Sequence, residues 1–199
     1  MSASESKLTA LPGDWSPLRF RLLGILPLMF FAARVFEYAY RAKTPEQILW
    51  SCHISNLLLA IGLFVASPLL IRIAVFWLIL GIPPWVIDMV VSKLVTPVSI
   101  FSHLGGFVVA MVAIYFVGAK RGSWLPSLVY FVMLQQITRL LTVPGPYTNV
   151  NVAHFAYGGM NGWFAHYWTY WLANTAAAAA TLWVMDWALA KLFPAERRE

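Results

Sequence analysis

The feature that most constrains this chain is a series of six apolar stretches, separated by short breaks that are polar or contain proline. The stretches lie at 19–40, 47–66, 69–91, 97–118, 124–141 and 166–192. An apolar helix of about 20 residues spans the hydrocarbon core of a bilayer. The runs are too continuous for the alternating strands of a transmembrane barrel. We therefore predict an all-α fold, an integral membrane bundle of six transmembrane helices.

The composition supports a membrane protein and excludes other classes. The 199 residues are 60% hydrophobic and only 11% charged, whereas a soluble domain is typically about 25% charged. The net charge is +6, but no basic run is long enough for a nucleic-acid footprint, so we predict no nucleic-acid partner. The single cysteine excludes an intrachain disulfide and a CxxC metal site.

We expect one domain between two short tails. Residues 1–18 form a polar N-terminal tail without a signal-peptide pattern, residues 19–193 the transmembrane domain, and residues 194–199 a C-terminal tail. Residues 142–165, the one long connection, are rich in aromatic side chains and hold no lysine or arginine. Connections of this length are usually functional or disordered, and we expect this one to pack as an extracytoplasmic lid.

Local signals predict where helices begin and bend. Thr44 followed by Pro45 is typical of a helix N-terminus, with Thr44 as the N-cap. Pro83-Pro84 predicts a kink in the third helix just before Asp88.

The distribution of basic residues predicts the orientation. Six crossings would place both termini and the loops after the second and fourth helices on one side, and these segments hold nine of the 14 Lys and Arg residues. Cytoplasmic segments are enriched in Lys and Arg. We therefore predict a multi-pass integral membrane protein with both termini cytoplasmic. If the protein is bacterial, its membrane would be the inner (cytoplasmic) membrane.

This orientation gathers the reactive side chains in the outer half of the bundle. All four histidines, the cysteine and the most deeply embedded acid, Asp88, fall there. Ionisable groups inside a membrane are costly and mark functional sites, so we predict a polar cavity that opens toward the outer leaflet. Arg34 and Glu37, three residues apart near the end of the first helix, are expected to form a structural ion pair.

Four residues are candidates for catalysis. His103 lies about seven residues into the fourth helix, and Ser99 lies one turn before it on the same face. His103 could act as a general base oriented by the Asp88 carboxylate. Cys52 could be a nucleophile activated by His103, although a buried cysteine is often an inert apolar filler. The serines that are alternatives to Cys52 are Ser51, Ser55 and Ser99.

Four further residues are candidates for substrate binding, namely His53, Asn56, Arg139 and His154. Asn56 shares a helix face with Cys52 and could stabilise an oxyanion. Arg139, at the expected lipid–water boundary, could bind a phosphate or carboxylate headgroup. The alternative is that Arg139 snorkels or pairs with Asp88.

The histidines also raise the question of a metal. Their spacings match no zinc motif, so we assign no metal ligands, and the identity of any cofactor stays open. A haem held by His53 and His103 across two helices is a geometric alternative.

Three short motifs resemble a known family: LWSCHISN at 49–56, TPVSIFSH at 96–103 and NVNVAH at 149–154. Over residues 46–155 the chain resembles the YwaF-like integral membrane family and, more distantly, the androgen-induced-gene type of transmembrane lipid hydrolases. The resemblance implies acyl-transfer chemistry on lipids, carried by Cys52 on the second helix and His103 on the fourth. In the hydrolase branch the nucleophile is a threonine, a residue type that this chain lacks in that region.

These expectations combine into a membrane-embedded lipid acyl hydrolase or acyltransferase with membrane lipids as partners. Its polar site would lie in the outer-leaflet half. One alternative is a non-catalytic accessory subunit of a larger membrane-protein complex, which the small size and abundant aromatic residues permit. Another is a haem- or metal-binding membrane protein, which an absorption spectrum would reveal.

Overall fold

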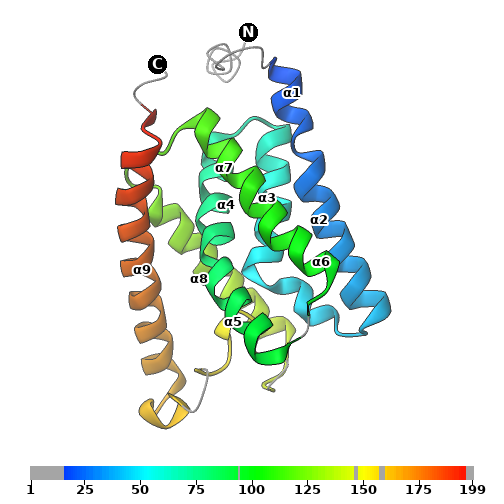
Figure 1. Cartoon of the computed structure of the whole chain (residues 1–199). Helices are drawn as coiled ribbons and strands as arrows, with labels where there is room; N and C mark the ends of the chain where they lie inside the picture. Colours follow the sequence, from blue (N-terminus) through cyan, green and yellow to red (C-terminus); the bar gives the residue numbers. More distant parts are fainter. Residues whose placement is uncertain (1–15, 94, 146–147, 157–159, 196–199) are drawn as a thin grey trace.

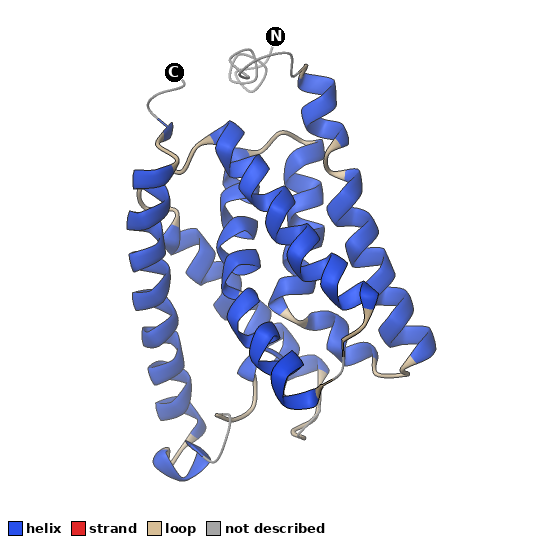
Figure 2. Ribbon diagram, viewed as in Figure 1, coloured by secondary structure: helices blue, strands red, loops and turns tan. Residues whose placement is uncertain are grey.

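The computed structural model describes residues 16–93, 95–145, 148–156 and 160–195, and most of them are helical (Figures 1 and 2). The α-helices are α1 (Pro17–Leu22), α2 (Ile25–Val35), α3 (Ser51–Phe64), α4 (Pro68–Leu80), α5 (Ile82–Ser92), α6 (Pro97–Ile100), α7 (Gly106–Val117), α8 (Trp124–Leu141) and α9 (Tyr167–Leu192). Phe36–Arg41 and Phe101–Gly105 are π-helical turns, and Pro45–Leu49, Val150–Val152 and Met160–Trp163 are 3-10 turns. No strand occurs among these residues, which confirms the all-α class. The predicted tails at 1–18 and 194–199 lie almost entirely outside the described residues.

The helices form six consecutive stretches at the predicted positions, and successive stretches run in opposite directions. α1 and α2 make the first stretch, α3 the second, α4 and α5 the third, α6 and α7 the fourth, and α8 and α9 the last two. Figure 1 shows the start of α1 and the end of α9 at the same end of the bundle. The end of α5, the start of α6 and the start of α9 lie at the opposite end.

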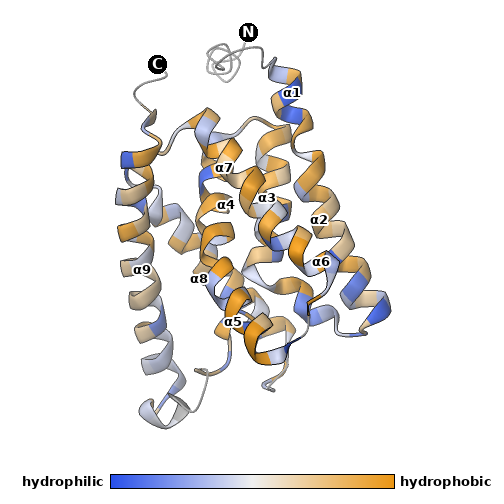
Figure 3. Ribbon diagram, in the orientation of Figure 1, coloured by the Kyte–Doolittle hydropathy of each residue, from blue (hydrophilic) through white to orange (hydrophobic). Residues whose placement is uncertain are grey.

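Three of the six stretches are long and apolar enough to cross a membrane, namely Pro17–Arg41, Pro68–Ser92 and Pro97–Val117. α3 is apolar but has only 14 residues. α8 and α9 have 18 and 26 residues but do not belong to this strongly apolar group. Figure 3 shows that much of α9 is pale or hydrophilic near its start. Length and hydropathy therefore support membrane crossing for three of the six predicted helices.

Large apolar side chains cover the outside of the bundle as well as its core. Met29 is 60% exposed, Val108 56% and Leu140 85%, and many other apolar side chains are similarly open. Soluble proteins rarely expose an apolar surface of this extent. Such an apolar surface is expected of a protein that is surrounded by lipid.

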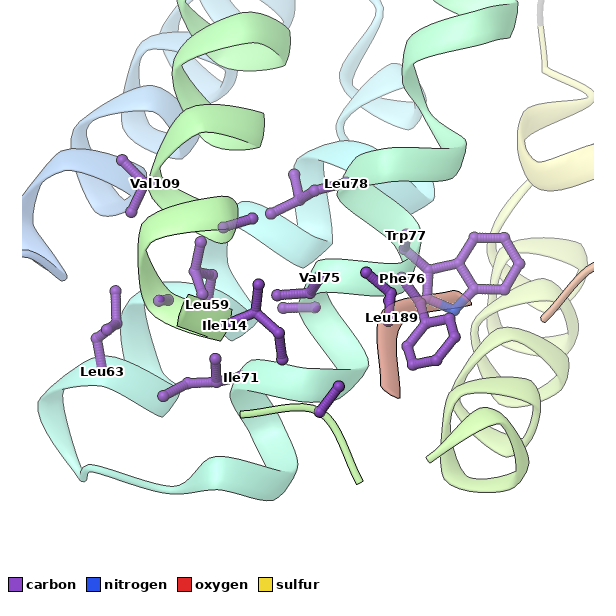
Figure 4. Packing of buried hydrophobic residues seen from close by; sticks show 14 of the residues in the cluster. Leu59, Leu63, Ile71, Val75, Phe76, Trp77, Leu78, Val109, Ile114 and Leu189 are labelled. Carbon is purple, nitrogen blue, oxygen red and sulfur yellow. The ribbon is translucent and has the colours of Figure 1, made fainter. Parts of the chain in front are cut away.

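α4 lies at the centre of the packing and contacts α3, α7 and α8. Its Ile71 belongs to the same buried cluster as Leu59 of α3 and Ile114 of α7 (Figure 4). On the side of α8, Trp77 stacks on Phe131 with ring centroids 4.4 Å apart. These close contacts hold the helices together by dispersion, which does not depend on water around the bundle.

One predicted boundary is present and another is wrong. The kink expected at Pro83-Pro84 appears as a break at Gly81, between α4 and α5. Thr44, however, makes no side-chain cap, and Pro45–Leu49 forms a 3-10 turn. An extended residue separates this turn from α3, which begins at Ser51.

The connection between α8 and α9 determines where α3 begins. The side-chain oxygen of Asn151 accepts a hydrogen bond from Ser51 N at 2.8 Å. The amide nitrogen of Asn151 donates to Leu49 O at 2.6 Å and to Thr138 Oγ1 at 3.0 Å. Because the first N–H groups of a helix have no partner within the helix, Asn151 supplies from a distant loop the cap that Thr44 does not. The loop thereby fixes the first turn of α3, which contains Cys52.

Candidate thiol–imidazole site

Two local structures bring the reactive side chains together. Cys52 and His53 lie in the first turn of α3. His103 lies in the π-helical turn Phe101–Gly105, between α6 and α7. A π-helical turn holds an extra residue, and such turns are frequent at functional sites. Here the turn changes the direction of His103 relative to a regular α-helix.

Cys52, His53 and His103 form a compact group, here called the thiol–imidazole cluster. The Cys52 Sγ atom and one ring nitrogen of each histidine all lie within 4.8 Å of one another. The two imidazole rings have centroids 5.7 Å apart. His53 is 3% exposed and His103 8%, whereas Cys52 is half-buried. The cluster thus joins one thiol to two imidazoles in a space largely closed to the outside.

Backbone carbonyls determine which ring nitrogens are free. His53 Nδ1 lies 3.0 Å from Gln47 O, and His103 Nδ1 lies 3.0 Å from Ser99 O. A carbonyl oxygen only accepts hydrogen bonds, so in both neutral rings the hydrogen lies on Nδ1 and the lone pair on Nε2. His53 Nε2 is buried and has no hydrogen-bond partner within the described part of the chain. Each histidine therefore presents a basic Nε2.

Arg34 brings a positive charge to the edge of the cluster. Its side chain is buried, and its Nε donates to Ser102 Oγ at 2.9 Å. Nη2 lies 3.5 Å from His103 Nδ1, and Nη1 is paired with Glu37 Oε2 at 2.5 Å. Thr96 Oγ1 donates to the other carboxylate oxygen of Glu37 at 3.1 Å. The predicted ion pair is present, and it lies against the site rather than at the periphery.

Aromatic rings hold the imidazoles in place. Trp85 is stacked on His103, with centroids 4.9 Å apart and ring planes 7° apart. Its Nε1 donates to Ser99 Oγ at 2.7 Å, which fixes the indole. The ring of Tyr38 lies against His53 at 5.5 Å. Stacking and the Nδ1 hydrogen bonds together leave each imidazole little freedom to rotate.

Two of the predicted catalytic residues are placed differently from the expectation. Asp88 is exposed, and the described neighbours of His103 Nδ1 are Ser99 O, Ser102 Oγ and Arg34 Nη2. The expected orienting contact from Asp88 is therefore not among the described contacts of His103 Nδ1. Ser99 acts through its backbone carbonyl, while its hydroxyl is bonded to an indole.

The other serines considered as nucleophiles have described partners outside the cluster. Ser55 is fully buried, and its hydroxyl lies 3.2 Å from the Tyr130 hydroxyl on α8. Ser51 begins α3 and is bonded through its N–H to the loop. Among the described residues, Cys52 is the nucleophile candidate that has a ring nitrogen of both histidines within 4.8 Å.

Asn56 is part of the framework around the cluster. Its Nδ2 donates to Cys52 O at 3.0 Å and to Ser102 O at 3.1 Å. Its side chain is buried, and a Cβ atom at Gly106 would lie 2.4 Å from its Oδ1. Both amide hydrogens are thus used, one within α3 and the other to join α3 to the π-helical turn. This position does not fit the expected role as an oxyanion donor.

Arg139 and His154 belong to a second polar group at the loop. Arg139 lies over the ring of Tyr167, 3.3 Å from its centroid. His154 Nε2 is 2.8 Å from Thr142 Oγ1, and the backbone N–H of His154 donates to Asn149 Oδ1 at 2.9 Å. Partial burial and the Arg139 charge lower the pKa of His154 below its ordinary value. These two candidates have no recorded contact with the thiol–imidazole cluster among the described residues.

Three residues of the site were not predicted from the sequence, namely Arg34, Trp85 and Tyr38. Arg34 carried a signal, because an arginine within an apolar helix is costly and marks a functional position. The tryptophan and tyrosine carried none, since aromatic residues are abundant throughout this chain.

Comparison with protein-family models, with curated proteins and with solved structures finds no match for the chain. The resemblance to the YwaF-like family therefore stays a prediction from its three short motifs, and the geometry of the cluster is the basis for function.

Proposed function

We propose that the protein is a membrane-embedded enzyme that transfers acyl groups of lipids, to water as a hydrolase or to an acceptor hydroxyl as an acyltransferase. The observation that carries the proposal is the buried cluster in which one sulfur lies within 4.8 Å of two imidazole nitrogens. A cysteine becomes a nucleophile when its thiol can give its proton to a neighbouring base such as histidine.

The proposed reaction begins when the Cys52 thiol gives its proton to Nε2 of His103 and the sulfur attacks the carbonyl carbon of a lipid ester. The ester C–O bond then breaks, and the imidazolium returns the proton to the leaving oxygen, so that Cys52 carries the acyl group as a thioester. Water or an acceptor hydroxyl attacks the thioester, and the sulfur regains a proton. The hydrogen bond from His103 Nδ1 to Ser99 O keeps the imidazole in the tautomer that these reaction steps need, with Nε2 free to accept the proton.

We assign stabilisation of the tetrahedral oxyanion to Arg34 rather than Asn56. Both amide hydrogens of Asn56 are bonded to carbonyl oxygens. Arg34 Nη2, by contrast, has only His103 Nδ1 nearby within the described chain, and that nitrogen already carries a hydrogen. Its N–H groups are therefore available to an anion, and a buried cation favours such an anion strongly.

An apolar groove along α8 supports an acyl-chain substrate. The groove is lined by Ile73, Leu125, Pro126, Val129, Tyr130 and Met133. Tyr130 connects it to α3, because its hydroxyl lies 3.2 Å from Ser55 Oγ, three residues after Cys52. We assign the groove to a lipid tail, which would bring the ester toward the thiol from the side.

The proposal includes six membrane crossings with both termini in the cytoplasm. Two observations support it. Both ends of the described chain lie at one end of the bundle (Figure 1), and the sequence segments on that side hold nine of the 14 Lys and Arg residues. The thiol–imidazole cluster would then lie in the outer half of the membrane.

The test uses the full-length protein in nanodiscs and a long-chain activated ester that acylates nucleophilic cysteines. Because the chain has one cysteine, labelling reports on Cys52 alone, and Cys52→Ala gives the background. We expect His103→Ala to slow labelling by a factor of about 10²–10⁴, the usual contribution of a general base.

His166→Gln is the matched control, since His166 is an exposed histidine outside the cluster. It should label at the rate of the unchanged protein. Circular dichroism and gel filtration establish that each variant is folded. Equal labelling rates for folded His103→Ala and the unchanged protein would refute the proposal.

A further inference from the structure

We infer that the thiol–imidazole cluster is also a binding site for a soft monovalent metal ion, copper(I). Its donors are the sulfur of Cys52 and the Nε2 atoms of His53 and His103. The inference rests on the geometry of these side chains and not on the proposed acyl transfer. The bound copper ion would occupy the same buried space as the proposed reaction and would block the Cys52 thiol.

The spacing of the donor atoms is close to that of a three-coordinate site. Three atoms at the corners of a triangle with 4.8 Å sides lie about 2.8 Å from its centre, and 4.8 Å is the upper limit of the separations between the Cys52 sulfur and one ring nitrogen of each histidine. Metal–nitrogen and metal–sulfur bonds are about 2.0–2.3 Å long. Each donor atom therefore needs to move inward by at most about 0.5–0.8 Å, a shift shorter than one carbon–carbon bond.

The hydrogen bonds at the Nδ1 atoms of both histidines are of the kind that metal-binding histidines make. In metal sites, a histidine usually donates its second ring N–H to a carbonyl or carboxylate, which sets the tautomer and the direction of the free nitrogen. Here Gln47 O and Ser99 O each lie 3.0 Å from an Nδ1 atom.

A second observation points to a ligand. His53 Nε2 is buried in a side chain that is 3% exposed, and it has no hydrogen-bond partner among the described residues. An unpaired polar atom in such a place costs free energy. A bound ion would satisfy this nitrogen.

Charge balance selects the class of ion. Arg34 and Glu37 form a pair with no net charge next to the cluster. The thiol loses its proton when a metal binds, so the donor set of one thiolate and two neutral imidazoles has a charge of −1. A monovalent ion makes the buried site neutral, whereas Zn²⁺ would leave the site with a net positive charge. Thiolate and imidazole donors suit copper, and Cu(I) accepts three ligands where structural zinc requires four.

The experiment is an anaerobic titration of the full-length protein in nanodiscs with Cu(I), in competition with the chromophoric chelator bathocuproine disulfonate. We expect one Cu(I) per chain. Cys52→Ser and His103→Gln should each weaken binding by more than about 100-fold, because loss of an outer-shell partner alone costs 10–100-fold. His166→Gln should bind as the unchanged protein does.

A second measurement on the unchanged protein avoids any question of misfolded variants. X-ray absorption at the copper edge should show one sulfur and two nitrogen neighbours, and Cu(I) should protect the single thiol from maleimide. Less than one bound Cu(I), undiminished binding by Cys52→Ser, or tighter binding of Zn²⁺ than of Cu(I) would each overturn the inference. Acylation of Cys52 in metal-free protein is measured separately, so failure of the copper site leaves the proposed acyl transfer untouched.

Discussion

The buried pair of Arg34 and Glu37 gives a prediction whose size follows from the geometry. The two side chains are 4% and 13% exposed and are joined at 2.5 Å. Two unit charges about 4 Å apart attract by about 4 kcal/mol at an effective dielectric constant of about 20. Removing one partner leaves the other buried without a counter-charge, which typically costs about 3–5 kcal/mol. We therefore expect Arg34→Met to lower the free energy of unfolding by about 3–5 kcal/mol.

The assay is a double-mutant cycle with Arg34→Met, Glu37→Met and the double variant, unfolded reversibly by SDS in mixed micelles. The double variant removes both charges together, so it should be more stable than the sum of the single effects by at least about 2 kcal/mol. Arg121→Met is the matched control. Arg121 lies 3.8 Å from Asp186 but is 56% exposed, so its loss should cost at most about 1 kcal/mol.

Additive effects of about 1 kcal/mol or less for Arg34→Met and Glu37→Met would refute the reasoning. They would show that the pair behaves as an exposed ion pair and that Arg34 does not supply a buried charge to the cluster.

Three further predictions concern the framework of the site and the loop. Gly106→Ala places a Cβ 2.4 Å from Asn56 Oδ1, so thermal unfolding in micelles should show a loss of about 1–3 kcal/mol, whereas Gly162→Ala, which meets nothing within 4 Å, should be neutral. Asn151→Ala removes three hydrogen bonds and an asparagine in the left-handed region, which should cost about 2–4 kcal/mol, and hydrogen exchange should increase first at the start of α3. The lowered pKa of His154 means that the unfolded state binds its proton more readily, so stability should fall as the pH drops below about 6.5. In His154→Gln this fall should be smaller, and an equal fall in both proteins would contradict the assignment.

The sequence predicted several helix positions well, including a break next to a pair of prolines. α8 was expected at 124–141 and runs from Trp124 to Leu141. The break in the third helix was expected because Pro83-Pro84 interrupts the hydrogen-bond ladder, and it occurs at Gly81. The start of the second helix was misplaced, because its cap comes from Asn151, 100 residues away, and no local pattern contains that information.

The sequence predicted that a histidine and a cysteine belong to the site, but it did not predict which groups orient them. Short motifs indicated Cys52 and His103, and the structure brings both together with His53. Asp88 was expected to orient His103 because both residues fall in the outer half of the predicted bundle. The orienting group is instead the carbonyl of Ser99, four residues before His103 and within the same helical segment. Backbone carbonyls leave no mark in a sequence, so this contact could not be predicted from residue types.

The central claim, that Cys52 accepts an acyl group, is tested most directly by isolating the thioester. The purified protein is incubated in vesicles of ester phospholipids, quenched in acid, digested and analysed by mass spectrometry. The account predicts an acyl chain on the peptide that contains Cys52, released by neutral hydroxylamine and absent from Cys52→Ala. An acyl chain on Ser51, Ser55 or Ser99, or no acylated peptide while the lipid is consumed, would contradict it.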